Sequence, residues 1–125
     1  PSNEKLFIEQ ATVIEELSEK ENCIIIGRCS NLILKERPDV LNVFVYSSDM
    51  EFKINRKMKY DNYENANDAL KDIQRIDAER AAYYNYFSPT LKWGDKNGYD
   101  LMIDTSKFGV EAAIELIKEY LKIIK

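Results

Sequence analysis

Arginines are the side chains in this sequence with the clearest chemical potential. Arg75 and Arg80 flank Asp77 in one helical pattern, and Arg56 lies in the helical pattern before it. A guanidinium is planar, always charged and suited to two-point hydrogen bonding with phosphate. Arginines on two helices joined by a polar break are typical of a mobile arm that closes over a phosphate during its transfer. The alternative is a solvated surface ion pair between Asp77 and Arg80, one helical turn apart.

A further arginine follows a short apolar run. Cys23–Gly27 contains three consecutive isoleucines, and Arg28 comes directly after the glycine. A run without polar alternation predicts a strand buried on both faces of a parallel sheet. Ligands bind at the carboxyl ends of such strands, so Gly27 would supply a tight exit and Arg28 would hold an anion. The alternative is a surface arginine at a strand end.

The elements that must position these arginines alternate between strand and helix patterns. Apolar spacing, cap residues and prolines predict helices over 4–20, 30–35, 66–87 and 108–124, and another that opens after the cluster Ser47–Asp49. Strands are predicted over 23–27, 40–46 and 99–103. Connections too long for hairpins indicate parallel pairing with right-handed crossovers, which is an α/β fold.

Composition excludes several classes of protein. The net charge of −4 argues against a general nucleic-acid binder, because phosphate neutralisation requires an excess of Lys and Arg. No apolar run is long enough to cross a bilayer and no leader pattern begins the chain, so a cytoplasmic location without membrane contact is expected. Cys23 and Cys29 are expected to be reduced, packed thiols. A redox or metal role is disfavoured because the chain has no histidine, and no metal site is predicted.

Several segments together resemble the cytidylate kinase-like family of P-loop kinases. The likeness runs from about Leu6 to Tyr120, and it rests on the order and spacing of motifs that are each weak alone. These motifs are Ile26–Cys29, Val43–Tyr46, Ile76–Tyr84, Trp93–Asp95 and Tyr99–Ser106.

The resemblance implies a fold and a reaction. The fold is a three-layer α/β/α arrangement with a parallel sheet of strand order 2-3-1-4-5, in which residues 1–125 form the C-terminal part of one domain and residues 50–93 form a lid before the last strand. The three predicted strands would be the third, fourth and fifth. Val43–Tyr46 and Leu101–Ile103 would then pair directly, with Ile24–Ile26 outside that pair. The reaction is transfer of the γ-phosphoryl group of ATP, with Mg²⁺, to a nucleoside monophosphate such as cytidylate or to a related small acceptor.

The resemblance also assigns roles to the candidate residues. Gly27 and Arg28 would bind the acceptor, and Asp77 would contact the acceptor or orient an arginine. Arg75 and Arg80 on the lid would reach the transferring group, with Arg56 near the lid entrance as a weaker catalytic candidate. The donor base would lie near Asp104, Thr105 and Ser106, for which capping of the last helix is the structural alternative.

Two departures from the family pattern affect these expectations. Cys29 stands where cytidylate kinases carry an aspartate, which leaves the identity of the acceptor open. No segment reads G-x-x-x-x-G-K-[ST], the loop that holds the ATP phosphates. The sequence is therefore expected to be the C-terminal portion of a longer kinase, inactive as these 125 residues alone. The alternative is a non-catalytic nucleotide-binding or structural module related to these kinases.

Overall fold

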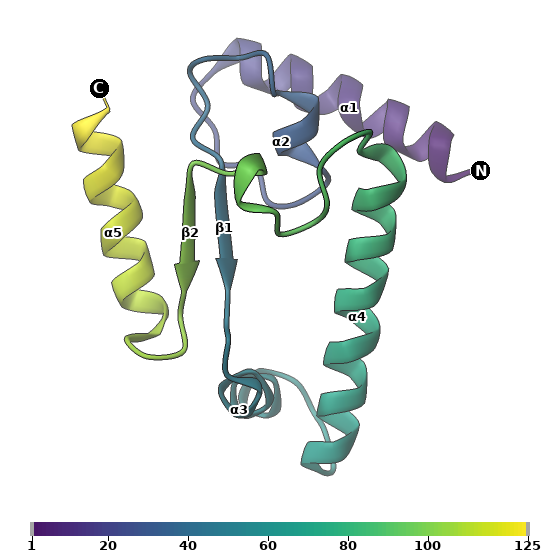
Figure 1. The fold of residues 1–125 in the computed structure, drawn as a ribbon, viewed down its shortest axis with the longest axis vertical. Coiled ribbons are helices and arrows are strands. Elements are labelled where there is room, and N and C mark those ends of the chain that lie inside the picture. The colour runs from purple at the N-terminus through teal and green to yellow at the C-terminus, as the bar shows by residue number, and fades with distance from the viewer. Residues whose placement is uncertain (1, 125) are drawn as a thin grey trace. The chain divides into compact units, whose positions relative to one another are not determined.

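The computed structural model describes residues 2–124. The chain forms two compact units that meet in sequence between Val40 and Leu41. Figure 1 shows the elements, which are five α-helices, one 3-10 helix and two strands over the described range. Unit 1 contains α1 (Asn3–Lys20) and α2 (Ser30–Ile33). Unit 2 contains β1 (Val43–Tyr46), α3 (Met50–Tyr60), α4 (Ala66–Phe87), the 3-10 helix η1 (Lys96–Gly98), β2 (Leu101–Asp104) and α5 (Gly109–Ile123).

Unit 1 begins with a capped helix. The Ser2 hydroxyl accepts a hydrogen bond from the backbone N–H of Lys5 and so satisfies one of the free donors at the start of α1. Ile14 of α1 and Leu34, which follows α2, are buried. The predicted helix at 4–20 is therefore confirmed to within one residue.

The predicted strand at Cys23–Gly27 is wrong. Residues 22–26 form no regular secondary structure, and the side chains of Ile24 and Ile26 are 91% and 87% exposed. A strand needs a neighbouring strand for its hydrogen bonds, and no segment of residues 2–124 pairs with this run. The expectation that both thiols are packed is also wrong for Cys23, which is exposed, whereas Cys29 is buried and burial raises its thiol pKa.

The predicted pairing of the other two strands is confirmed. β1 and β2 are parallel and form the only sheet among the described residues, with Val43 opposite Leu101 and Tyr46 opposite Asp104. Both strands are shorter than predicted. The two segments that lead into β1 and β2 are also linked, because the Asp100 carboxylate accepts a hydrogen bond of 2.7 Å from the Asn42 backbone N–H. Unit 2 is thus a mixed α/β structure around a small parallel sheet.

The connection between the two strands contains α3 and α4, which pack against each other. The Asp49 carboxylate caps α3 by accepting from the N–H groups of Glu51 and Phe52, and the Asn65 side chain caps α4 by accepting from Asp68. α4 ends at Phe87, directly before Ser88-Pro89, because a proline cannot continue a helix. The predicted bounds of this helix, 66–87, are confirmed.

An aromatic cluster fixes the return from α4 to β2. Phe44 of β1 contacts Trp93 edge-on, with ring centroids 5.4 Å apart, and Tyr99 at 4.9 Å. The Asn85 side chain accepts a hydrogen bond from the Trp93 backbone N–H. Gly94 lies beside Phe44 with a φ of +82°, a left-handed conformation that favours glycine. These contacts attach the C-terminal end of α4 to the sheet.

Within residues 2–124, no helix combines the length and apolar character needed to cross a membrane.

Candidate functional site

The central part of α4 presents an arginine on the side of the helix that is otherwise buried. Ala69, Ile73 and Tyr84 are the buried residues of α4. At about 100° per residue, Arg80 lies about 20° from Ile73 around the helix axis and about 40° from Tyr84. The Arg80 side chain is nevertheless 64% exposed. We call this side of α4 its inner face.

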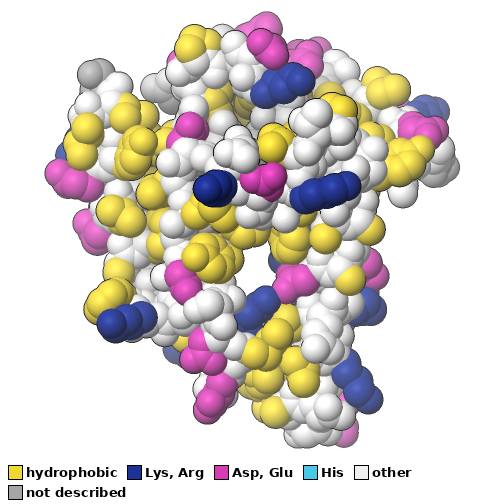
Figure 2. Space-filling model, in the orientation of Figure 1, with side chains coloured by type: hydrophobic (Ala, Val, Ile, Leu, Met, Phe, Trp, Pro, Cys, Tyr) yellow, Lys and Arg dark blue, Asp and Glu magenta, His cyan; other side chains and the backbone are white. Residues whose placement is uncertain are grey.

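The surface of unit 2 is open beside α4. Figure 2 shows an opening between α4 and the sheet, bordered by both positive and negative side chains. An arginine that lies on the inner face but keeps more than half of its side-chain surface accessible is available to an anion.

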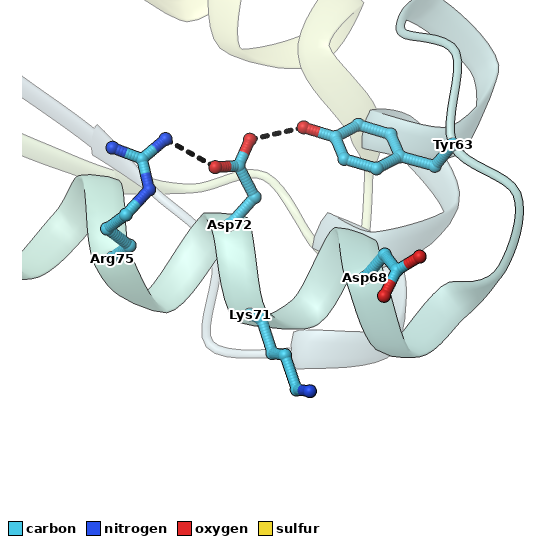
Figure 3. Close-up of a pocket in the computed structure, with 5 residues that line it drawn as sticks. All are labelled: Tyr63, Asp68, Lys71, Asp72 and Arg75. Carbon is cyan, nitrogen blue, oxygen red and sulfur yellow. Dashed lines mark hydrogen bonds and ion pairs between the residues drawn. The ribbon is translucent and has the colours of Figure 1, made fainter.

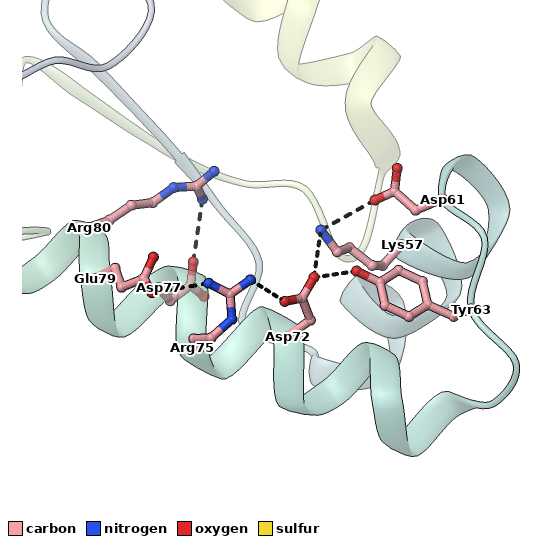
Figure 4. Close-up of polar contacts among 8 residues, drawn as sticks. All are labelled: Lys57, Asp61, Tyr63, Asp72, Arg75, Asp77, Glu79 and Arg80. Carbon is pink, nitrogen blue, oxygen red and sulfur yellow. Dashed lines mark hydrogen bonds and ion pairs between the residues drawn. The ribbon is translucent and has the colours of Figure 1, made fainter.

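Two further charged residues join Arg80 in an ion-pair chain that links α3 with α4. The Asp77 carboxylate accepts a hydrogen bond of 2.6 Å from the Lys53 ammonium through Oδ2. Its other oxygen, Oδ1, lies 3.4 Å from the Arg80 guanidinium, as drawn in Figure 4. Lys53 and Asp77 are both about 30% exposed, at 29% and 30%. We call Lys53, Asp77 and Arg80 the inner triad; it contains two cations and one anion.

Arg75 lies on the opposite side of α4. It is five residues from Arg80 and so about 140° away around the helix. Its guanidinium pairs with Asp72 at 2.5 Å and with Glu79 at 3.0 Å (Figure 4). We call the side of α4 that carries Asp72, Arg75 and Glu79 its outer surface. The structure therefore brings Arg80 and Asp77 together, but it does not place Arg75 with them.

A shallow depression of about 350 Å³ occupies this outer surface. Figure 3 shows Asp72 at its centre, hydrogen-bonded to the Tyr63 hydroxyl on one side and to Arg75 on the other. These two bonds, that of Tyr63 first, lower the pKa of Asp72, and the Asp72 carboxylate raises the pKa of Tyr63. The depression is completed by Asp68 and Lys71. Its central charges are already paired with each other, so it is a weaker candidate for a ligand site than the inner face.

The linker between α3 and α4 is tied to both helices. Tyr63 bonds to Asp72 of α4, and Lys57 of α3 lies 3.3 Å from Asp61 and 3.7 Å from Asp72. The polar break that the sequence indicates is therefore bonded to its flanking helices.

Arg56 of α3 is exposed and lies over the ring of Tyr60, 5.0 Å from its centroid. This cation–π contact holds the guanidinium along its own helix.

Gly27 and Arg28 belong to unit 1, where the backbone takes a tight turn. Gly27, Arg28 and Cys29 have consecutive φ values of 69°, 60° and 58°. The tight turn expected at Gly27 is present, but it follows an irregular segment and not a strand, and it extends over two residues that rarely adopt this conformation. Arg28 is exposed at the turn, and Cys29 precedes α2 as its N-cap.

The carboxyl ends of β1 and β2 are joined by a polar clamp. Asp104 accepts hydrogen bonds from the backbone and hydroxyl of Ser48 and from the backbone and hydroxyl of Ser106. These bonds, with that of the Ser48 hydroxyl first, hold the pKa of Asp104 far below its usual range. Thr105 is buried and its hydroxyl donates to the Tyr46 carbonyl. The side chains at 104–106 therefore connect the strand ends, and α5 has no side-chain cap.

No group of three potential metal ligands occurs among residues 2–124.

Sequence reasoning missed Lys53. Its partner Asp77 is 24 positions away, so no local helical spacing connects them. The signal that could have found it is the pairing of two adjacent amphipathic helices, whose facing charges are expected to meet.

Comparison with known proteins agrees with this architecture. The chain is similar to a crystal structure of an uncharacterized protein from Eubacterium ventriosum, with 30% sequence identity and a TM-score of 0.86 over 93% of this chain. The chain spans 64% of the length of that protein. A search of curated proteins finds no match. The model of the cytidylate kinase-like family matches residues 1–107, and the chain therefore belongs to the cytidylate kinase-like family.

Proposed function

We propose that this chain is part of a kinase that transfers the γ-phosphoryl group of ATP to a nucleoside monophosphate such as cytidylate, or to a related small acceptor. Membership of the cytidylate kinase-like family supports a kinase-related or nucleotide-binding role. The observation that carries the proposal is the exposure of the Arg80 side chain on the otherwise buried face of α4.

The inner triad suits the chemistry of phosphoryl transfer. This reaction needs positioning and neutralisation of charge on the transferred group more than it needs a general base. Arg80 would contact the phosphoryl oxygens, with Lys53 behind it as a second positive charge. Mg²⁺, when bound with ATP, supplies further neutralisation of the phosphates. In this proposal α3 and α4 form the lid.

The sheet supports the further proposal that the intact protein has the three-layer P-loop kinase fold. Among the described residues β1 has a strand neighbour on one side only, and its Val45 and Tyr46 side chains are 52% and 40% exposed. An apolar strand with an unpaired edge is a ready template for another strand. In the order 2-3-1-4-5, the strand that leads into the phosphate-binding loop would pair there.

Arg28 would bind the phosphate of the acceptor. Its support is local, because a charged, exposed side chain lies at a turn with three consecutive left-handed residues. Backbone strain of this kind is retained where the surrounding structure or the function requires it.

The test is direct phosphorylation by the full-length protein, expressed from its complete reading frame. It is incubated with Mg²⁺ and ATP labelled on the γ-phosphate, together with each of the common nucleoside monophosphates in turn. The expected result is labelled nucleoside diphosphate from one acceptor or a small group of acceptors. Binding of nucleotides without any labelled product would contradict the kinase proposal and favour the non-catalytic module.

A further inference from the structure

We propose that Lys53 is a positioning residue that keeps Arg80 available for phosphate by occupying Asp77. This inference rests on the proposed function, because it concerns how the same site binds the transferred group. Lys53 lies on α3, outside the arginines that the sequence brings to attention, and it does not itself need to touch the nucleotide.

The geometry of the inner triad is unequal. Asp77 lies 2.6 Å from the Lys53 ammonium but 3.4 Å from the Arg80 guanidinium. The shorter contact is a charge-assisted hydrogen bond of normal length, whereas the longer one is near the limit for hydrogen bonding. Asp77 therefore interacts mainly with Lys53 and only weakly with Arg80.

The charge of the triad has the same consequence. Lys53 and Arg80 contribute two positive charges against one negative charge from Asp77, so the net charge is positive. Without Lys53, Asp77 and Arg80 would form a neutral pair on the same helix. A phosphate would then have to compete with Asp77 for the guanidinium, and the attraction of the site for an anion would fall.

The rest of α4 provides a contrast that supports this account. On the outer surface Arg75 is held by two carboxylates, those of Asp72 and Glu79, at 2.5 and 3.0 Å. On the inner face two cations share one carboxylate. The two arginines thus have opposite surroundings, and only Arg80 belongs to a group with an excess of positive charge.

Lys57 offers a matched control for Lys53. It lies one turn further along α3, and it too pairs with a carboxylate of α4, Asp72, at 3.7 Å. Lys53→Met and Lys57→Met each remove one positive charge and one ion pair between the same two helices. Lys53 pairs with the partner of Arg80, whereas Lys57 pairs with Asp72, the partner of Arg75, and also with Asp61 of the linker.

The experiment measures binding of inorganic pyrophosphate to the full-length protein by calorimetry, at one fixed low salt concentration. We expect Lys53→Met to raise the dissociation constant about tenfold, Lys53→Arg to restore it to within about threefold, and Lys57→Met to leave it within about twofold. Arg80→Ala should raise the dissociation constant more than Lys53→Met does. A structural role alone would affect both Met variants similarly. A contrast between them, together with the rescue by arginine, therefore shows that the pairing of Asp77 with a cation at position 53 controls phosphate binding by Arg80.

The outcomes separate the two proposals. Equal affinity of Lys53→Met and wild type, with weaker binding in Arg80→Ala, would overturn the role of Lys53 and leave the phosphate site intact. Equal losses in the two Met variants would also overturn it, because helix packing would then explain the effect. If wild type bound no pyrophosphate, both the phosphate site and the role of Lys53 would be overturned.

Discussion

The stability of unit 2 should depend strongly on Ile73, a buried residue of α4, and this can be measured with one substitution and one control. Ile73 is 6% exposed, so Ile73→Ala removes three buried carbon atoms. At about 0.8 kcal/mol for each, the lost transfer free energy is about 2.4 kcal/mol, and an unfilled cavity would raise the loss towards 4 kcal/mol. Ile123 in α5 is 75% exposed, so Ile123→Ala should cost only about 0.6 kcal/mol on the same scale.

The assay is urea denaturation followed by circular dichroism, combined with native-state hydrogen exchange. The free energy of unfolding should fall by about 2–4 kcal/mol in Ile73→Ala. Amides of α3 and α4 should lose protection before those of β2, since Ile73 belongs to the helix pair. Equal losses in the Ile73 and Ile123 variants would refute the assignment of Ile73 and Arg80 to one inner face, because that assignment depends on which side of α4 is buried.

Three further changes test other parts of the structure. Asp104→Asn should make the stability of the protein less dependent on pH in the acid range, because hydrogen bonds from Ser48 and Ser106 lower the pKa of Asp104 in the folded state. The stabilisation by Asp104 is present above its unfolded pKa of about 3.9 and is lost as the pH falls below that value. Urea midpoints that run parallel for variant and wild type from pH 6 to pH 3 would contradict this. Arg28→Ala in the full-length protein should lower kcat/KM at least about 100-fold. Tm should change little, since arginine and alanine are equally disfavoured at a φ of 60°; unchanged activity would remove Arg28 from the site. Gly94→Ala should destabilise the protein by about 1 kcal/mol because of its φ of +82°, and an unchanged urea midpoint would show that the turn relaxes.

The sequence predicted best the elements whose signals are local. The 66–87 helix has a capping asparagine at one end and Ser88-Pro89 at the other, so both boundaries were readable from a few residues. The parallel pairing of the two strands followed from the long helical connection between them. Short-range chemistry thus fixes the bounds of the helix, and the length of the connection fixes the direction of the strand pairing.

The run of isoleucines before Gly27 shows where local signals fail. Cys23–Gly27 has strong β propensity, but a strand exists only where a neighbour supplies its hydrogen bonds. No described segment does so, and the run stays irregular and largely exposed. The β propensity of the run is therefore not enough to form a strand without a neighbouring strand among residues 2–124.

The candidate site was predicted in part for a similar reason. The pair Asp77–Arg80 is one turn apart and was readable, whereas the opposite directions of Arg75 and Arg80 required the position of the buried face. Lys53 required knowledge of how α3 packs on α4. The residues at 104–106 were expected near a nucleotide base or at a helix cap, and their side chains instead join the two strand ends. Their proposed proximity to the base stays a prediction.

The most direct test of the central claim compares the two arginines of α4 in the phosphoryl-transfer reaction. The measurement is kcat of the full-length protein, with its best acceptor and saturating ATP and Mg²⁺, for wild type, Arg80→Ala and Arg75→Ala. Because Arg80 lies on the inner face and Arg75 is paired with Asp72 and Glu79 on the outer surface, we predict a loss of about 10³-fold for Arg80→Ala and less than about fivefold for Arg75→Ala. Equal losses in the two variants, or a larger loss for Arg75→Ala, would contradict the account.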